Sequence, residues 1–288
     1  MIVIPNRQIW TRQPTGPVDL NWSNPLAAGL VFANPLRPGV GMLDLIQRQM
    51  PTWVGGSARG SNRYGEFVKL GSQYLSFSKQ PQMSASQPCS ITWIQEPSSL
   101  PGYQTVMEFN VGGGGTFLVG FQSATDASYR MVFGTRLAPS PKSHWNALGA
   151  PVVGVTTLYT AVFPAGVGGD HANCRLYRNG VGYARGGTPS LTPHNGNYFY
   201  IGANTGGTNP FYGLLGNALI HARALDEGEA KGLYENPWQV YECRSRHIFV
   251  GASGSPTAYT LPADSGTFAL TGTDATLASC LLYTSRCV

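Results

Sequence analysis

Apolar and polar residues alternate along much of the chain between residues 30 and 223. The alternation is clear over residues 89–93, 117–121 and 129–133, where every second side chain is apolar. A period of two with one apolar face is typical of antiparallel sheets that pack on a core. Residues 157–163 form a run rich in β-formers, which predicts a buried strand. We therefore predict an all-β fold, a sandwich of two packed antiparallel sheets.

The dipeptide Asn179-Gly180 separates two β-prone runs, residues 174–178 and 181–183. Asn and Gly both tolerate the positive φ angles that the central residues of a type I′ turn require. This segment is therefore predicted to be a tight β-hairpin.

One helix is predicted near the end of the alternating region. Asp226 caps its first turn, and Glu229, three residues later, reaches back to the cap as a capping box. Ala230 and Leu233 then fall on one helical face, and Pro237 prevents the helix from continuing. The strands are thus followed by a single short helix.

Composition agrees with an all-β fold and narrows the function classes. The chain of 288 residues contains 37 Gly and 21 Pro, and only 11% of its residues are charged, against about 25% in typical proteins. The net charge of +5 comes from scattered basic residues, and no run of them alternates with stacking aromatics. We therefore expect no nucleic-acid binding.

The five cysteines do not indicate a disulfide framework, and the apolar segments do not indicate membrane insertion. Cys89 and Cys174 lie within strand-like alternation, so buried free thiols are expected, which suits assembly in a reducing cytosol. Residues 147–169 carry no charge, but Pro, Gly and Thr interrupt them, so a transmembrane helix is not expected. The apolar stretch at the start of the chain is too short for a secretory signal.

The sequence changes in character after residue 241. A Gly- and Ser-rich stretch there is typical of a flexible linker. Two short β-prone units follow, too small to bury a core, and the last residues resemble translated adapter sequence. The predicted regions are an N-terminal extension (1–20), the β-domain (21–242), a linker (243–258), the start of a truncated β-rich repeat (259–279) and an adapter-derived end (280–288).

The order of these signals resembles the laminin-G-like jellyrolls of the concanavalin A-like lectin/glucanase class. Residues 200–234, with an Arg-Ala-Leu-Asp corner at 223–226, resemble the closing motif of that family. Residues 176–180 resemble its hairpin, and residues 90–93 resemble one of its strands. The resemblance covers roughly residues 21–241 and implies a concanavalin A-like jellyroll with one short C-terminal helix.

Residues 9–14 and 236–239 further resemble laminin-G-like proteins of bacteriophages and prophages. This resemblance implies a non-catalytic virion module, such as a tail-fibre or surface component, assembled in the cytoplasm of a bacterial host. The expected partners are glycans or neighbouring virion proteins, and self-association into a homo-oligomer stays open. Because this fold hosts many functions, a glycosidase or polysaccharide lyase and a purely architectural virion protein are kept as alternatives.

The resemblance does not bring a metal site with it. Calcium-binding relatives place acidic ligands in loops at the rim, whereas Asp126 and Asp170 here are isolated. Asn217 stands near the point where the family usually has an acidic residue. His171 and Cys174 lack the two further ligands that a zinc site needs. No cofactor is therefore predicted; the family analogy leaves calcium open, although no calcium ligands are identifiable.

Carboxylates arranged for glycoside hydrolysis are not evident in the sequence. A retaining glycosidase needs two carboxyl groups about 5–5.5 Å apart, and no predicted strand carries such a pair. The acidic cluster at residues 226–229 is explained by the helix start that it stabilises. Glu96 and Glu108 flank one connection and are interpreted as unrelated surface acids. We therefore expect no enzyme activity.

Candidates for ligand contact lie in or beside predicted loops. Their aromatic rings and amide groups suit contact with sugar rings. Trp145, between His144 and Asn146 in a Pro-rich loop, is the strongest of them. The candidate ligand-binding residues are Tyr103, Trp145, Asn204 and Tyr212.

Overall fold

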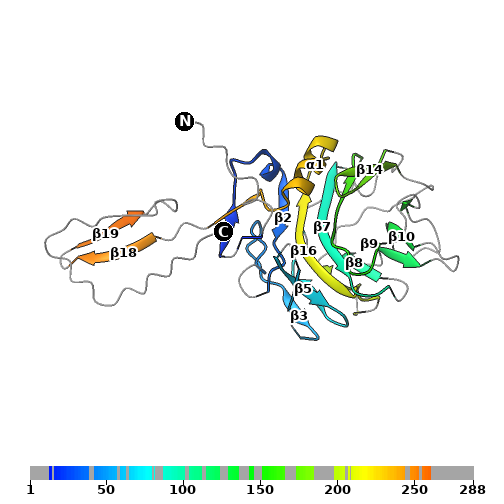
Figure 1. Ribbon diagram of the computed structural model, residues 1–288, viewed down its shortest axis with the longest axis horizontal. Helices are drawn as coiled ribbons and strands as arrows, with labels where there is room; N and C mark the ends of the chain where they lie inside the picture. The colour runs from blue at the N-terminus through cyan, green and yellow to red at the C-terminus, as the bar shows by residue number, and fades with distance from the viewer. Residues whose placement is uncertain are drawn as a thin grey trace.

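The computed structural model shows a sandwich of two antiparallel sheets with one α-helix (Figure 1). This confirms the predicted all-β jellyroll with a short C-terminal helix. The structure describes residues 13–14, 16–38, 42–56, 59–62, 65–79, 81, 87–100, 104–111, 115–123, 129–135, 143–145, 151–165, 173–184, 198–204, 207, 209–243, 247–252 and 255–260.

Every strand pair within the two sheets is antiparallel. The first sheet runs in the order β14 (Val181–Ala184), β13 (Arg175–Arg178), β12 (Thr157–Phe163), β7 (Cys89–Pro97), β16 (Gly213–His221), β5 (Gly65–Leu70) and β4 (Arg59–Asn62), and β2 (Leu30–Asn34) also pairs with β16. The second runs in the order β11 (Ser143–Trp145), β10 (Tyr129–Thr135), β9 (Gly115–Ser123), β8 (Gln104–Val111), β15 (Tyr198–Ile201), β6 (Tyr74–Phe77) and β3 (Thr52–Val54). We call them the eight-stranded and the seven-stranded sheet.

The main core lies between the two sheets. Phe32 of the eight-stranded sheet packs edge-on against Phe77 and Phe199 of the seven-stranded sheet, with ring centroids 5.3 and 5.0 Å apart. Trp93 and Tyr159, paired on β7 and β12, stack at 5.3 Å in the same layer. All five side chains are almost fully buried, so this aromatic layer joins the sheets.

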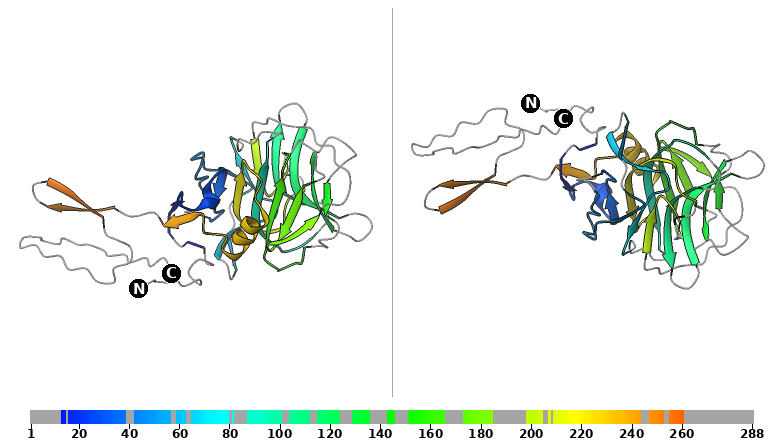
Figure 2. Two further views of the ribbon diagram at one scale, coloured as in Figure 1. Left: turned by 90° about the horizontal axis from the view of Figure 1, so that it is seen from above. Right: turned by 90° about the horizontal axis from the view of Figure 1, so that it is seen from below.

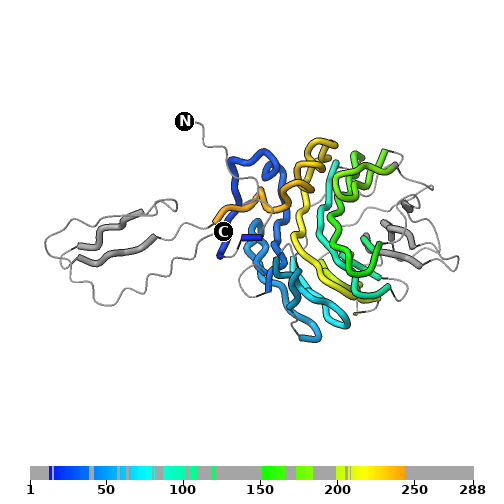
Figure 3. Tube along the Cα trace, in the orientation of Figure 1, coloured from blue at the N-terminus to red at the C-terminus, as the bar shows by residue number. Residues whose placement is uncertain are grey.

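A second core covers the outer face of the eight-stranded sheet. Helix α1 (Glu227–Glu235), labelled in Figure 1, buries Ala230 and Leu233 there. The 3-10 helix η2 (Pro25–Ala27) buries Leu26. Strands β1 (Val18–Leu20) and β17 (Tyr241–Cys243) pair with each other and add to this layer. Figure 3 shows these two strands side by side, one from each end of the domain.

Both local signals of the sequence are confirmed. Asn179 and Gly180 have φ angles of 52° and 76° and join β13 to β14 as a hairpin. Asp226 and Glu229 form the predicted capping box, and the helix ends at Glu235. These signals depend on neighbouring residues only, which explains why the sequence reveals them.

Two strand pairs lie at the predicted domain boundaries. β1, at the end of the predicted extension (1–20), pairs with β17. β18 (His247–Ala252) and β19 (Ser255–Thr260) form a hairpin that begins in the predicted linker (243–258) and ends in the predicted repeat. Gly and Ser there favour the turn of a hairpin as readily as a flexible chain.

The cysteine predictions have two outcomes. Cys89 and Cys174 are buried thiols that form no disulfide bond, as predicted. Cys243, in contrast, is disulfide-bonded, so the cysteines of this chain are not all thiols. The sequence did not indicate this bond because disulfide partners are set by tertiary distance and not by spacing along the chain.

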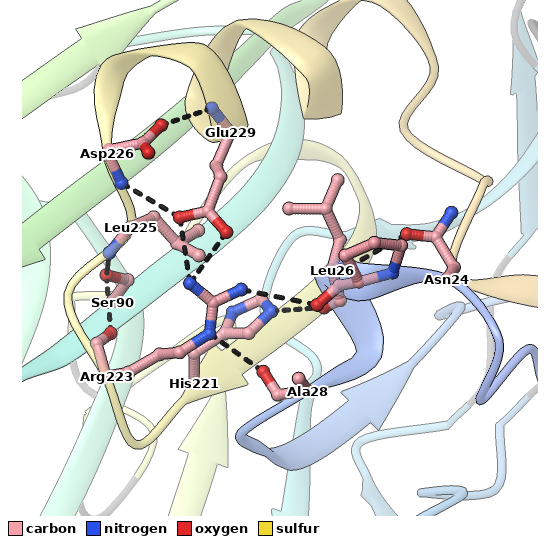
Figure 4. A network of polar contacts seen from close by, with 10 residues as sticks. Asn24, Leu26, Ala28, Ser90, His221, Arg223, Leu225, Asp226 and Glu229 are labelled. Carbon is pink, nitrogen blue, oxygen red and sulfur yellow. Dashed lines mark hydrogen bonds and ion pairs between the residues drawn. The ribbon is translucent and has the colours of Figure 1, made fainter.

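A polar network ties the closing corner of the domain to its N-terminal segment (Figure 4). Arg223 donates hydrogen bonds to the Glu229 carboxylate, at 2.8 Å, and to the Ala28 carbonyl, at 2.9 Å. The Ser90 hydroxyl donates to the Arg223 carbonyl and accepts from the Leu225 amide, both at 2.9 Å. The Arg-Ala-Leu-Asp corner is therefore hydrogen-bonded to the N-terminal segment, to the helix and to β7.

His221 lies beneath this network and is fully buried. Its Nε2 is 2.8 Å from the Leu26 carbonyl oxygen, whereas Nδ1 has no partner among the described residues. Burial is the largest cause of a pKa of His221 lowered from 6.5 to about 4; the hydrogen bond to Leu26 and the Glu229 carboxylate act to raise the pKa, and the Arg223 guanidinium acts to lower it. The imidazole of His221 is therefore neutral in the folded protein at neutral pH.

We expect acid to destabilise the fold through His221. The unfolded chain takes up this proton near pH 6.5 but the folded chain only near pH 4, so stability is lost as pH falls through this window and is fully present above it. The loss is about 3 kcal/mol. Urea unfolding at pH 7, 5.5 and 4 should show a steeper decline for the native chain than for His221→Gln. Equal declines would contradict this assignment.

Candidate functional site

The outer face of the seven-stranded sheet carries the candidate site, which is built on β15 and its neighbours. Tyr200 of β15 lies directly opposite Ser76 of β6 on one side and Glu108 of β8 on the other. Residues 199 and 201, on either side of it, point into the main core. Because side chains alternate along a strand, Tyr200 points away from that core.

Tyr74 of β6 completes an aromatic pair on this face. Its ring lies 5.7 Å from that of Tyr200 at an interplanar angle of 71°, an edge-to-face contact. Both rings are partly exposed. A Cβ at Gly207 would come within 3.1 Å of Tyr74, so the absence of a side chain at Gly207 allows this loop to approach the ring.

Hydroxyl groups and a carboxylate surround the two tyrosines. Ser76 is partly exposed and Thr52, opposite it on β3, is exposed. Glu108 is fully buried, although it belongs to the same outer face. The face therefore presents two tyrosine rings and hydroxyl groups to solvent, whereas Glu108, opposite Tyr200 on β8, is not exposed.

The two sheets differ in how their outer faces are used. That of the eight-stranded sheet is covered by α1, η2 and the β1–β17 ribbon. Among the described residues, no second hydrophobic cluster of this kind lies on the outer face of the seven-stranded sheet. Figure 2 shows α1 and the ribbon gathered on one side, with β8, β9 and β10 on the other. The Tyr74–Tyr200 face is thus a sheet surface on which both rings are partly exposed.

Tyr212 and Asn204 are two of the predicted candidates that the structure describes. Tyr212 donates its backbone N–H to the Gln104 side chain at 3.3 Å, and its own side chain is partly exposed. Asn204 belongs to the loop after β15, and only 2% of it is exposed, whereas the sequence predicts an amide that faces a ligand. Tyr103 lies outside the described residues.

Trp145 lies in an edge strand and not in a loop, which corrects the sequence interpretation. It is the last residue of β11 and pairs with Met131 of β10. Met131 pairs with Phe121, and Phe121 with Gln104. Trp145 therefore shares a cross-strand row with the start of β8, three strand spacings away, or about 14 Å. The Pro residues around it hid this short strand.

The structure separates the two acids that were considered as a pair. Glu96 points to the outer face of the eight-stranded sheet, where Asn62 donates a hydrogen bond to it at 2.7 Å and the Thr156 hydroxyl donates another. Glu108 belongs to the outer face of the opposite sheet. The sandwich lies between them, so they do not form the carboxylate pair of a glycosidase. Asp126, Asp170 and His171 lie outside the described residues.

The alternation of side chains along the strands indicates that Tyr74 and Tyr200 face away from the core, although neither is among the candidates predicted from the sequence. Each tyrosine lies next to apolar residues that fill the core, as in Tyr74-Leu75-Ser76-Phe77. An aromatic residue at a position facing away from the core indicates a surface role. Strand pairing was needed to bring the two together, because 125 residues separate them in the chain (200 − 74 − 1).

Residues 70–231, more than half of the chain, match the laminin-G family of the concanavalin A-like lectin/glucanases superfamily, and the chain belongs to this family. No curated protein matches the chain.

Solved structures with a similar fold include sugar-related proteins and a toxin. Domain 4 of AbnA, an extracellular GH43 arabinanase from Geobacillus stearothermophilus, solved with arabinotriose, has a TM-score of 0.56 at 17% identity over 71% of this chain and 98% of that domain. The binding domain of Paraclostridial Mosquitocidal Protein 1 has a TM-score of 0.51 at 16% identity, over 73% of this chain and 52% of that one. A Trypanosoma rangeli sialidase complex has a TM-score of 0.52 at 15% identity, over 81% and 38%. This chain thus spans about half of the toxin domain and less of the sialidase.

No helix among the described residues is long and apolar enough to cross a membrane.

Proposed function

We propose that the protein is a non-catalytic glycan-binding module whose site is the Tyr74–Tyr200 face. The observation that carries this proposal is a pair of partly exposed aromatic rings in edge contact on the outer face of the seven-stranded sheet. Sugar rings present C–H groups to aromatic surfaces and hydroxyl groups to polar neighbours such as Ser76. The similar fold of an arabinanase domain solved with arabinotriose supports a carbohydrate as the class of ligand.

Truncation of the tyrosine pair is expected to abolish most of this binding. The Tyr74→Ala, Tyr200→Ala double variant should weaken affinity at least about fivefold, because each aromatic contact is worth about 0.5–1.5 kcal/mol. A glycan array that includes arabinotriose would find a ligand, and calorimetry would measure its affinity. Tyr234→Ala is the matched control, since Tyr234 is 44% exposed but lies on α1, over the other sheet. Equal losses in both variants would contradict the site.

The absence of catalysis is part of the proposal. It is supported by the separation of Glu96 and Glu108 onto opposite outer faces. A reducing-end assay on bacterial surface polysaccharides and on arabinan tests it. Sustained turnover that is lost in Glu108→Gln would favour a carbohydrate-active enzyme instead.

We also propose that the module works on a virion, as part of a tail fibre or surface structure that contacts glycans or neighbouring virion proteins. This step is supported by the sequence resemblance of residues 9–14 and 236–239. Genes for tail or capsid proteins beside this one would support it, and genes for other functions there would count against it. A stable homo-oligomer that binds no glycan would favour a purely architectural role.

A further inference from the structure

Trp22 is the most exposed of the large hydrophobic side chains among the described residues. Of its surface, 67% is exposed, whereas Trp93 and Trp238 are 0% and 2% exposed. Tryptophan is highly buried on average, because its large ring gains much from leaving water. The fold therefore does not use Trp22 for its own core.

The backbone around Trp22 is held in place on both sides. The Asn21 amide donates to the Val240 carbonyl at 2.9 Å, and the Asn24 amide donates to the Asn21 carbonyl at 3.0 Å, which closes a turn around the ring. The Asn24 side chain donates to the Gln239 carbonyl at 3.0 Å and accepts from the Leu26 amide at 2.9 Å. Trp22 is thus presented from a fixed turn, so little conformational entropy is lost when it is covered.

The two residues that flank Trp22 in the chain, Asn21 and Ser23, are polar. The Ser23 hydroxyl donates to the Asn21 side-chain oxygen at 2.5 Å, which fixes the amide orientation. Among the described residues, the Asn21 side-chain nitrogen makes no hydrogen bond. An exposed flat apolar ring that is flanked in the chain by an amide and a hydroxyl suits a sugar ring, which combines a C–H face with a rim of hydroxyl groups. A protein-binding hot spot would instead be surrounded by further apolar side chains.

We propose that the Asn21–Ser23 turn is a second carbohydrate-binding site, in which Trp22 stacks on a sugar ring and Asn21 and Ser23 contact its hydroxyl groups. It lies on the connection from β1 to η2, both of which pack on the outer face of the eight-stranded sheet. The Tyr74–Tyr200 face is on the opposite side of the sandwich. Trp22 also lies outside residues 70–231, which match the family. The inference does not depend on the tyrosine site.

Fluorine NMR of the full chain labelled with 5-fluorotryptophan tests this site directly. The Trp22 signal is assigned by its absence in Trp22→Ala, and arabinotriose, xylotetraose, cellotetraose and chitotetraose are titrated separately. We expect at least one sugar to shift the Trp22 signal saturably while the signals of buried Trp93 and Trp238 stay in place. Trp22→Ala should weaken the affinity of that sugar for the site about tenfold, and Trp22→Phe should retain part of it.

The tyrosine variants separate the two sites. Tyr74→Ala, Tyr200→Ala should leave the Trp22 response unchanged, and its loss there would show that the two sites are not independent. A Trp22 signal that none of the four sugars shifts overturns the proposal. So does a signal that moves only with protein concentration, because Trp22 would then be a contact between copies of the chain.

Discussion

Replacement of Phe32 by Ala is expected to lower the free energy of unfolding by about 3–5 kcal/mol, the range for large aromatic truncations in a core. Phe32 is fully buried and contacts Phe77 and Phe199 of the opposite sheet edge-on. Its removal takes away both inter-sheet aromatic contacts and leaves a cavity that the strands cannot close. Urea unfolding monitored by circular dichroism measures the loss.

Phe32→Leu is the matched control for this cavity. Leu keeps an apolar group at the centre of the layer, so the loss should be about 1–2 kcal/mol. Phe77→Ala combined with Phe32→Ala should cost less than the sum of the single changes, since the two rings share one contact. Additive losses, or a loss below about 1 kcal/mol for Phe32→Ala, would show that this layer does not join the sheets.

Asn217→Ala is expected to cost a similar amount, about 3–5 kcal/mol, for a different reason. Asn217 is fully buried in β16 with a φ of 45°. Its side chain donates to the Pro237 carbonyl and accepts from the Tyr241 hydroxyl at 2.8 Å. Ala would leave both partners unpaired in the core, and it tolerates a left-handed conformation less well than Asn.

Asn217→Gly separates the two causes. Gly adopts a positive φ without strain but cannot replace the hydrogen bonds, so it should recover only the backbone part of the loss. Tyr241→Phe should be nearly additive with Tyr74→Ala but strongly coupled to Asn217→Ala. Full recovery of stability in Asn217→Gly would mean that backbone strain, and not the hydrogen bonds, fixes this residue.

Asn217 also shows why one position of the family motif differs here. The pairing of β16 shifts at this point, from β5 at Leu215 to β2 at Ala218. The backbone N–H of Asn217 donates to the Pro35 carbonyl at 3.2 Å, at the position where β16 passes from β5 to β2. An amide side chain can both donate and accept there, which a carboxylate cannot. The residue therefore has a structural role at the centre of the sheet.

The strands, the Asn179-Gly180 hairpin and the capping box at Asp226 follow from residues close together in the chain, so the sequence by itself determined them. The two-sheet architecture also followed, because alternation shows that each strand has an apolar face to bury. The solvent exposure of Trp22 could not be predicted, since the sequence around a tryptophan does not show whether its ring is buried or exposed.

Only the tertiary structure decided which residues meet. Tyr74 and Tyr200 share a face because β6 and β15 pair in one register, and a shift of one residue would turn either ring into the core. Other strand pairs decide the remaining positions. Glu96 and Glu108 lie on opposite surfaces, Trp145 lies in an edge strand, and β1 pairs with β17. Local patterns fix what each segment forms, whereas register and packing depend on contacts between distant segments, which no short stretch of sequence contains.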